Sequence, residues 1–174
     1  MHSAPPHWPD NVRLVSTGRQ GGFSKDPFAS LNLALHVGDK ESAVRENRQQ
    51  LNTLLGTAVE LCWLDQVHGC RIERLESSPG DKQIAACDAS WTSVPGLACT
   101  IMTADCLPVL FTHRSGEFVA AAHAGWRGLA GDILESTAAA LPGAPGDLRA
   151  WLGPCIGPSA YEVSIEVAEA VRRA

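Results

Sequence analysis

Two apolar stretches constrain the fold of this chain most: GLACTIMTADCLPVLF (residues 96–111) and EFVAAAHAG (residues 117–125). Short apolar runs bounded by turn-forming residues are typical of buried strands. The first run is interrupted at Ala104-Asp105-Cys106, and Pro108 disfavours a helix across that break. We therefore expect one strand that ends near Cys106 and another that ends near His123.

Helical and strand patterns alternate along much of the remaining sequence. Residues 38–56 carry apolar side chains on one face, with Asp39 as the expected helix cap and Gly56 as its expected end. Two more helices are expected at residues 126–143 and 165–174, the last one capped by Ser164. Further strands are expected at residues 12–17, 60–69, 70–76 and in the first part of 148–158. This partial alternation predicts an α/β (α+β) class, with mixed β-sheets covered by helices.

Length and composition indicate one globular domain. The chain has 174 residues, of which 45% are hydrophobic and 19% charged, enough to bury a core. We expect a single catalytic domain over residues 1–174, with a loose, proline-rich segment at 1–10. The apolar runs are too short to span a membrane, and the N-terminus lacks the pattern of a signal peptide. We therefore expect a cytoplasmic protein with no membrane partner.

Charge and cysteine content exclude two further classes. The net charge is −5 and the pI about 5.6, and no run of Lys or Arg offers a footprint for nucleic acid. A disulfide-rich secreted protein is disfavoured because no export signal is visible. We expect reduced, buried thiols, with Cys106 as the exception, from the six cysteines Cys62, Cys70, Cys87, Cys99, Cys106 and Cys155.

Three residues that suit a metal stand at the expected ends of three strands: His68, Cys106 and His123. Two imidazoles and one thiolate suit zinc and leave a fourth coordination position open, as in catalytic zinc sites. Isolated His and Cys residues are more often ordinary packing residues, so the pattern alone leaves packing and metal binding open. Cys106 is also a candidate nucleophile, with His123 or His68 as its base and Asp105 orienting the histidine.

The stretch HAGWRGLAG (residues 123–131) suggests an anion site. Arg127 lies between Gly125 and Gly128 at an expected strand-to-helix junction. Backbone N–H groups at a helix start, together with an arginine, can hold a phosphate. A surface ion pair is the equally simple explanation for Arg127.

Several motifs in order give the chain a recognisable resemblance. QVHG, CDA, TADCLPVLF, AAHAGWRG and GPCIGPSAYEV, preceded by ASLNLALHVGD, resemble the YfiH family, long labelled multicopper polyphenol oxidase or laccase-like. The resemblance implies an αββα layered fold similar to that of cysteine hydrolases. It implies metal ligation by His68, Cys106 and His123. Family chains continue beyond residue 174, so we expect this chain to be truncated at its C-terminus.

The same resemblance implies purine nucleoside chemistry: phosphorolysis of adenosine, inosine or methylthioadenosine, and deamination of adenosine. In phosphorolysis, Arg127 and Arg19 are the candidates that hold phosphate. In deamination, a metal would activate water for attack on C6 of adenine. Asp105 is the first candidate proton carrier, followed by Asp65 and Glu162. We expect Zn²⁺ as cofactor, with Cu²⁺ as the alternative, a nucleoside and phosphate as partners, and a monomer or homodimer.

Three other functions remain open at this point. A copper-binding polyphenol oxidase is one, although six histidines in total are too few for a four-copper assembly. A single His₂Cys site could still bind copper and oxidise phenols weakly. A metal-free cysteine hydrolase that uses Cys106 and His123 is the second. A metal-binding or interaction module without turnover is the third.

Overall fold

The structure, a computed structural model, describes residues 5, 7–80, 82–84 and 86–173. Most of the expected loose start, residues 1–4 and 6, lies outside the described residues. Contacts within the chain divide it into two units, Leu14–Glu60 and Pro5–Arg13 with Leu61–Ala174. Each unit is described by itself, and the expectation of a single catalytic domain stays a prediction.

The first unit contains the helix α1 (Glu41–Leu55) and the long loop that precedes it. Val44, Asn47 and Leu51 are its buried residues. The apolar face expected at Val44, Leu51, Leu54 and Leu55 is confirmed at Val44 and Leu51, but Leu54 is 59% exposed. Gly56 ends the helix at φ 98°, and its N–H donates to the carbonyl of Asn52. The expectation that Asp39 caps the helix is wrong. Lys40 occupies the cap position without a side-chain hydrogen bond. The Asp39 carboxylate lies one residue too early, and it accepts from the Asn32 amide at 2.9 Å and from the N–H of Lys40 at 2.7 Å.

One buried amide orders the loop of the first unit. Asn47 is 0% exposed, and its Oδ1 accepts the N–H of Phe23 at 2.7 Å. Its Nδ2 donates to the hydroxyl of Ser24 and to the carbonyls of Ser30 and Asn32. Three of these four contacts are to backbone groups of the loop, and the fourth is to the Ser24 hydroxyl, so the loop depends on Asn47.

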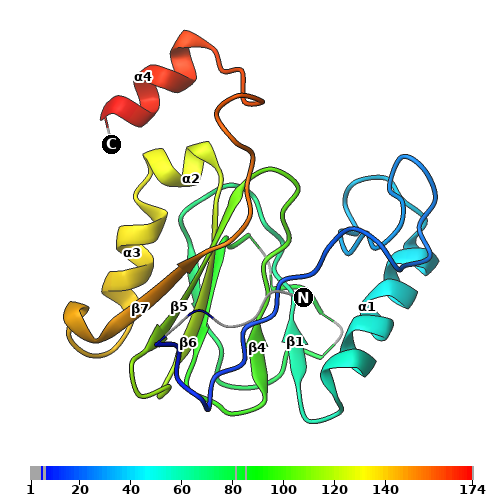
Figure 1. The fold of residues 1–174 in the computed structure, drawn as a ribbon, viewed down its shortest axis with the longest axis horizontal. Helices are drawn as coiled ribbons and strands as arrows, with labels where there is room; N and C mark the ends of the chain where they lie inside the picture. Colours follow the sequence, from blue (N-terminus) through cyan, green and yellow to red (C-terminus); the bar gives the residue numbers. More distant parts are fainter. Residues whose placement is uncertain (1–4, 6, 81, 85, 174) are drawn as a thin grey trace. The chain divides into compact units, whose positions relative to one another are not determined.

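The second unit contains a mixed five-stranded sheet in the order β2-β3-β6-β5-β7. Figure 1 labels three of its strands, β5, β6 and β7. β2 and β3 pair in parallel, and the other three pairs are antiparallel. A separate two-stranded sheet joins β1 and β4. The strands span Glu60–Cys62 (β1), Ile72–Arg74 (β2), Ala89–Thr92 (β3), Leu97–Cys99 (β4), Leu107–His113 (β5), Val119–Ala124 (β6) and Leu148–Leu152 (β7). The expected mixed α/β class is confirmed.

β6 lies at the centre of this unit. The helices α2 (Trp126–Ala130) and α3 (Ile133–Ala140) contact β6, and so does β4. Ala120, Ala122 and Ala124 belong to the buried core cluster together with Ile133 of α3. Because successive side chains on a strand point to opposite faces, His123 points away from that cluster. Small residues on β6 therefore let the helices approach closely, and His123 faces the other side of the sheet.

Several expected elements differ from the structure. Residues 12–17 form no strand. The expected helix at 126–143 is two helices, since Asp132 adopts the left-handed conformation at φ 62° between α2 and α3. The 3₁₀ turn Pro145–Asp147 and the helix α4 (Ile165–Arg173) complete the unit. At α4, the Ser164 hydroxyl accepts the N–H of Val167 at 3.4 Å, in agreement with the expected cap.

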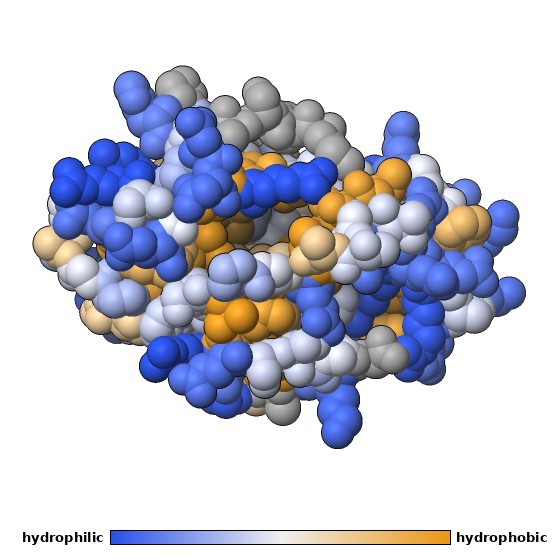
Figure 2. Space-filling model, turned by 90° about the horizontal axis from the view of Figure 1, so that it is seen from below, coloured by the Kyte–Doolittle hydropathy of each residue, from blue (hydrophilic) through white to orange (hydrophobic). Residues whose placement is uncertain are grey.

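The cysteines and the surface agree in part with expectation. All six cysteines are free thiols, but only Cys62 and Cys87 are buried as expected. Cys155 is exposed in the irregular segment after β7, and the other three, Cys70, Cys99 and Cys106, are partly buried. Among the described residues, no helix is both long and apolar enough to cross a membrane. Hydrophilic side chains cover much of the face drawn in Figure 2, with separate hydrophobic patches between them.

We predict that Asn47→Ala destabilises the first unit. The substitution removes the side-chain partner of the Phe23 N–H and of the Asn32 carbonyl, both part-buried, which should cost about 3 kcal/mol in unfolding free energy. Urea denaturation and limited proteolysis within residues 18–33 measure the effect. The matched control is Asn52→Ala on the exposed face of the same helix, which should change stability by less than about 0.5 kcal/mol. Equal behaviour of the two variants would show that the loop does not depend on Asn47.

Candidate metal centre

The structure brings His68, Cys106 and His123 together. One potential ligand atom from each lies within 4.8 Å of the other two. The Cys106 Sγ is 3.9 Å from Nε2 of His68. The two imidazole rings meet edge to face, with centroids 4.7 Å apart. The three residues that the sequence analysis singled out therefore form one cluster.

Antiparallel pairing of β5 and β6 explains why Cys106 and His123 meet. Leu107 pairs with Ala124, and Pro108 pairs with His123. Cys106 comes directly before β5, while His123 is the penultimate residue of β6. The expectation that Cys106 ends a strand is therefore wrong. It precedes a strand, and the antiparallel arrangement places the start of β5 beside the end of β6.

His68 reaches the cluster from a loop, and the expectation that it ends a strand is also wrong. β1 ends at Cys62, and His68 adopts the left-handed conformation at φ 60°. The neighbouring Gln66 fixes this loop to the segment ahead of Cys106. Its side-chain amide donates to the carbonyl of Met102 and accepts the N–H of the same residue, both at 2.8 Å. These two hydrogen bonds from the Gln66 side chain therefore hold the loop of His68 beside the segment that leads to Cys106.

Asp88, just before β3, is a site residue that sequence reasoning missed. It is 0% exposed, and its Oδ1 accepts from Nδ1 of His123 at 2.8 Å. Backbone N–H groups of Val67, His68 and Gly69 also donate to its two oxygens. Burial acts to raise the pKa of Asp88, but the hydrogen bonds from His123 and these N–H groups outweigh it and lower the pKa. Asp88 is therefore an ionised acceptor at neutral pH.

The donor set fits a single zinc or copper ion. A tetrahedral zinc ion with one nitrogen and one sulfur ligand separates those two atoms by about 3.5 Å. The observed 3.9 Å between Cys106 and His68 needs a shift of only a few tenths of an ångström. His123 is 3% exposed, Cys106 half-buried and His68 exposed. The cluster is therefore closed on one side and open to solvent on the other.

The Cys106 thiol is not poised as a free nucleophile in this geometry. Its burial, with smaller effects from the carboxylates of Asp105 and Asp88, raises the pKa of the thiol above its usual value. A thiol of raised pKa is mostly protonated at neutral pH, whereas a cysteine nucleophile works as a thiolate. Metal coordination removes that proton, since the ligand form of cysteine is the thiolate.

The remaining candidate residues of the second unit are all exposed, and none has a demonstrated role. Asp105 is exposed next to Cys106, and Asp65 and Glu162 are also exposed. The exposed Arg127 places its guanidinium over the ring of Trp126, 4.3 Å from the centroid. The catalytic and substrate-binding assignments of these side chains stay predictions.

Arg19 belongs to the first unit. Its guanidinium donates twice to the carbonyl of Ala29, at 3.1 and 3.0 Å. These contacts account for its place in the loop of that unit. The assignment of Arg19 to phosphate binding stays a prediction.

A family model described as multi-copper polyphenol oxidoreductase laccase matches residues 13–174. A purine nucleoside phosphorylase of Pseudomonas aeruginosa is 54% identical over 168 residues, which cover 95% of this chain and 66% of that protein. The purine nucleoside phosphorylase YfiH of Escherichia coli is 47% identical, with 95% and 68% covered. The chain thus spans about two thirds of the length of these curated relatives.

Solved structures show the same fold. A crystal structure of a Neisseria meningitidis protein superimposes with a TM-score of 0.87 at 42% identity, covering 97% of this chain and 68% of that one. The crystal structure of YlmD from Geobacillus stearothermophilus gives a TM-score of 0.76 at 37% identity, with 88% and 62% covered. The mixed α/β architecture described above is therefore that of these proteins.

We predict that Gly125→Ala impairs metal binding without unfolding the chain. A Cβ on Gly125 would lie 2.9 Å from Cδ2 of His68 and 3.1 Å from Sγ of Cys106. Gly125 has φ −72° and ψ 166°, which alanine adopts freely, so the effect is a steric one on the ligands. Zinc affinity, measured by competition with a chromogenic chelator, should fall about tenfold or more.

The control for this variant is Gly157→Ala, where an added Cβ meets nothing within 4 Å. Its zinc affinity and melting temperature should match those of the unmodified chain. If Gly125→Ala also keeps full affinity, the three side chains are not the ligands.

Proposed function

The chain belongs to the family described as multi-copper polyphenol oxidoreductase laccase, and from this premise we propose that it acts as a metal-dependent purine nucleoside phosphorylase. The observation that carries the proposal is the cluster of His68, Cys106 and His123, which is open on one side. Three protein ligands and one free position are typical of a catalytic zinc site. The names of the Pseudomonas and Escherichia relatives supply the reaction class.

The arrangement of histidines favours this reaction over multicopper oxidation. A multicopper oxidase needs a His₂Cys copper and a further copper cluster held by many more histidines. Among the described residues, His68, Cys106 and His123 are the only group of three or more metal-ligating side chains that lie together. His113 lies at the far end of β5, about 20 Å along the strand. The described residues therefore offer one such group of metal ligands, not the several that a multicopper oxidase needs.

Phosphorolysis breaks the glycosidic bond between C1′ of the ribose and N9 of the purine. A phosphate oxygen forms the new bond to C1′, and the electron pair of the broken bond stays on the purine, which takes up a proton. The products are the free base and ribose 1-phosphate. When bound, a zinc ion supplies a Lewis acid that orients and polarises an oxygen of the reactants.

Arg127 is the residue we assign to phosphate. It follows His123 by four positions, at the start of α2, and its exposed guanidinium can donate to two phosphate oxygens. Stacking on Trp126 holds the guanidinium plane in one orientation, which lowers the entropy lost when phosphate binds. Asp105, exposed beside Cys106, is the group we assign to proton transfer with the purine.

Deamination of adenosine is the second activity that we propose for the same cluster. Zinc deaminases of nucleobases use histidine and cysteine ligands, as this cluster would. The reaction replaces the C6 amino group by oxygen from water and releases ammonia. Asp105 would then carry the proton between water and the leaving amine.

The decisive experiment is a chromatographic assay of the zinc-loaded chain with adenosine, with and without phosphate. Adenine that forms only with phosphate supports phosphorolysis, and inosine supports deamination. A strong chelator should abolish both. Turnover that survives chelation but is lost on alkylation would instead identify Cys106 as a nucleophile of a cysteine hydrolase.

We predict that Arg127→Ala raises the KM for phosphate roughly 10- to 100-fold, because it removes a charge-assisted interaction of about 1.5–3 kcal/mol. The control is Arg114→Ala, which removes an exposed arginine paired with Asp147 away from the cluster. That variant should keep the normal KM. Steady-state kinetics at varied phosphate provide the comparison. Equal losses of phosphorolysis and deamination in Arg127→Ala would contradict the assignment.

A further inference from the structure

One buried carboxylate, Asp88, contacts two of the three clustered residues at once. Its Oδ1 accepts the backbone N–H of His68 at 2.9 Å and Nδ1 of His123 at 2.8 Å. Its Oδ2 accepts the N–H groups of Val67 at 3.1 Å and Gly69 at 2.8 Å. All four partners are donors, so both oxygens are fully used and the side chain is not available for proton transfer.

The contact with His123 determines which ring nitrogen can bind a metal. An ionised carboxylate only accepts hydrogen bonds, so Nδ1 of His123 carries the proton. The lone pair of the imidazole is then on Nε2, on the far side of the ring from Asp88. The backbone carbonyl of Asp88 also accepts the N–H of His123 at 2.7 Å. Asp88 therefore fixes the position and the tautomer of this histidine.

The contact with the His68 loop determines where the second histidine lies. His68 has a positive φ of 60°, a conformation that a residue with a Cβ adopts at a cost of about 1 kcal/mol or more. Three consecutive N–H groups, those of Val67, His68 and Gly69, converge on the Asp88 carboxylate. Such a concave set of N–H groups favours an anion at its centre, which offsets the cost of the turn.

We propose that Asp88 is a positioning residue that assembles the metal centre by tying His68 and His123 to one buried carboxylate. The inference rests on the proposed metal-dependent function. Asp88 thereby has a role in metal binding although it is not itself one of the three clustered residues. Loss of the carboxylate would disturb two of the three ligands together.

Asp88→Asn tests the role of the carboxylate with almost no change in size. An asparagine has one acceptor oxygen and one NH₂ group, so the NH₂ faces two donors in either orientation. If the NH₂ faces His123, then Nδ1 must accept, and the proton moves to Nε2, where it blocks the metal. If it faces Val67 and Gly69, the loop that carries His68 loses its anchor.

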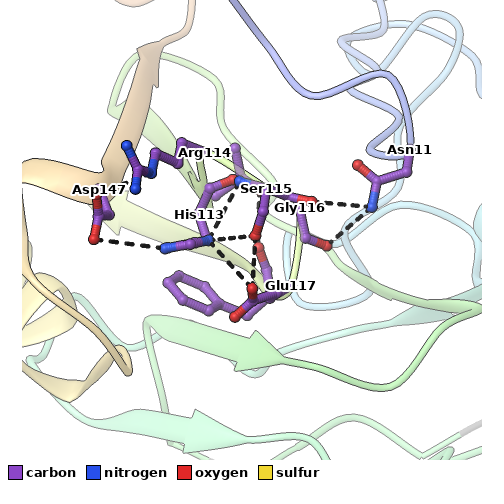
Figure 3. Close-up of polar contacts among 9 residues, drawn as sticks. Asn11, His113, Arg114, Ser115, Gly116, Glu117 and Asp147 are labelled. Carbon is purple, nitrogen blue, oxygen red and sulfur yellow. Dashed lines mark hydrogen bonds and ion pairs between the residues drawn. The ribbon is translucent and has the colours of Figure 1, made fainter.

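The matched control is Asp147→Asn. Figure 3 shows Asp147 in a polar cluster with His113 and Arg114, at the end of β5 remote from Cys106. Asp147 lies 3.9 Å from Nε2 of His113 and 3.0 Å from Nε of Arg114. The control removes one carboxylate that contacts a histidine, as the test variant does, but it leaves Asp88 unchanged.

The first measurement is a titration of the metal-free protein with Co²⁺. Binding is monitored through the thiolate-to-cobalt charge-transfer band and the visible bands of tetrahedral cobalt. Asp88→Asn should bind Co²⁺ about 10- to 100-fold more weakly and with altered visible bands. Asp147→Asn should match the unmodified chain. Unchanged cobalt affinity and spectrum in a folded Asp88→Asn variant would overturn the proposal.

The second measurement needs neither metal nor a folded variant. Nitrogen-15 NMR of the imidazole rings, on the unmodified metal-free chain at pH 8, should show His123 with its proton on Nδ1. A proton on Nε2 would overturn the proposal even if Asp88→Asn does not fold. If the unmodified chain binds no Co²⁺, the proposed metal function fails, whereas the NMR result still decides whether Asp88 fixes His123.

Discussion

The antiparallel pairing of β5 with β6 is the constraint on which the rest of the site depends. Its register places the residue before β5 beside the last residues of β6. Cys106 and His123 therefore lie close together at the open end of the β5–β6 hairpin. Alanines along β6 let the helices pack closely on one face, which leaves His123 on the other. The loop of His68 then needs only to be brought to this edge. Gln66 and Asp88 do so through hydrogen bonds to backbone groups.

Much of the candidate site could be predicted from the sequence, but for partly incorrect reasons. His68, Cys106 and His123 do gather as the sequence predicted. Only His123 does so at the end of a strand. An apolar run has the same pattern whether the polar residue beside it precedes or follows the strand. Which part of the run becomes the strand depends on pairing with residues far away in the sequence. The short length of β1 likewise depends on its pairing partner, which no local pattern reveals.

Single polar residues with decisive roles were the part that sequence reasoning could not find. Asp88 has no periodic signal, and its only mark was the short CDA motif ahead of β3. Asn47 occupies the buried face of an amphipathic helix, where the sequence pattern gives a polar residue no role. Its role is visible only from its hydrogen bonds to the loop. Both residues act through hydrogen bonds to distant backbone groups, and sequence spacing says nothing of those. The group of two histidines and one cysteine could be found because these residue types suit a metal and because the family resemblance implies the same three residues.

The proposed function depends on a metal ion held by two imidazoles and one thiolate. X-ray absorption at the zinc edge of the loaded chain tests this directly, because nitrogen and sulfur ligands scatter differently. We expect one sulfur at about 2.3 Å, two imidazole nitrogens at about 2.0 Å and one further light atom. A shell without sulfur, or with several sulfurs, would contradict the assignment of His68, Cys106 and His123 as the ligands.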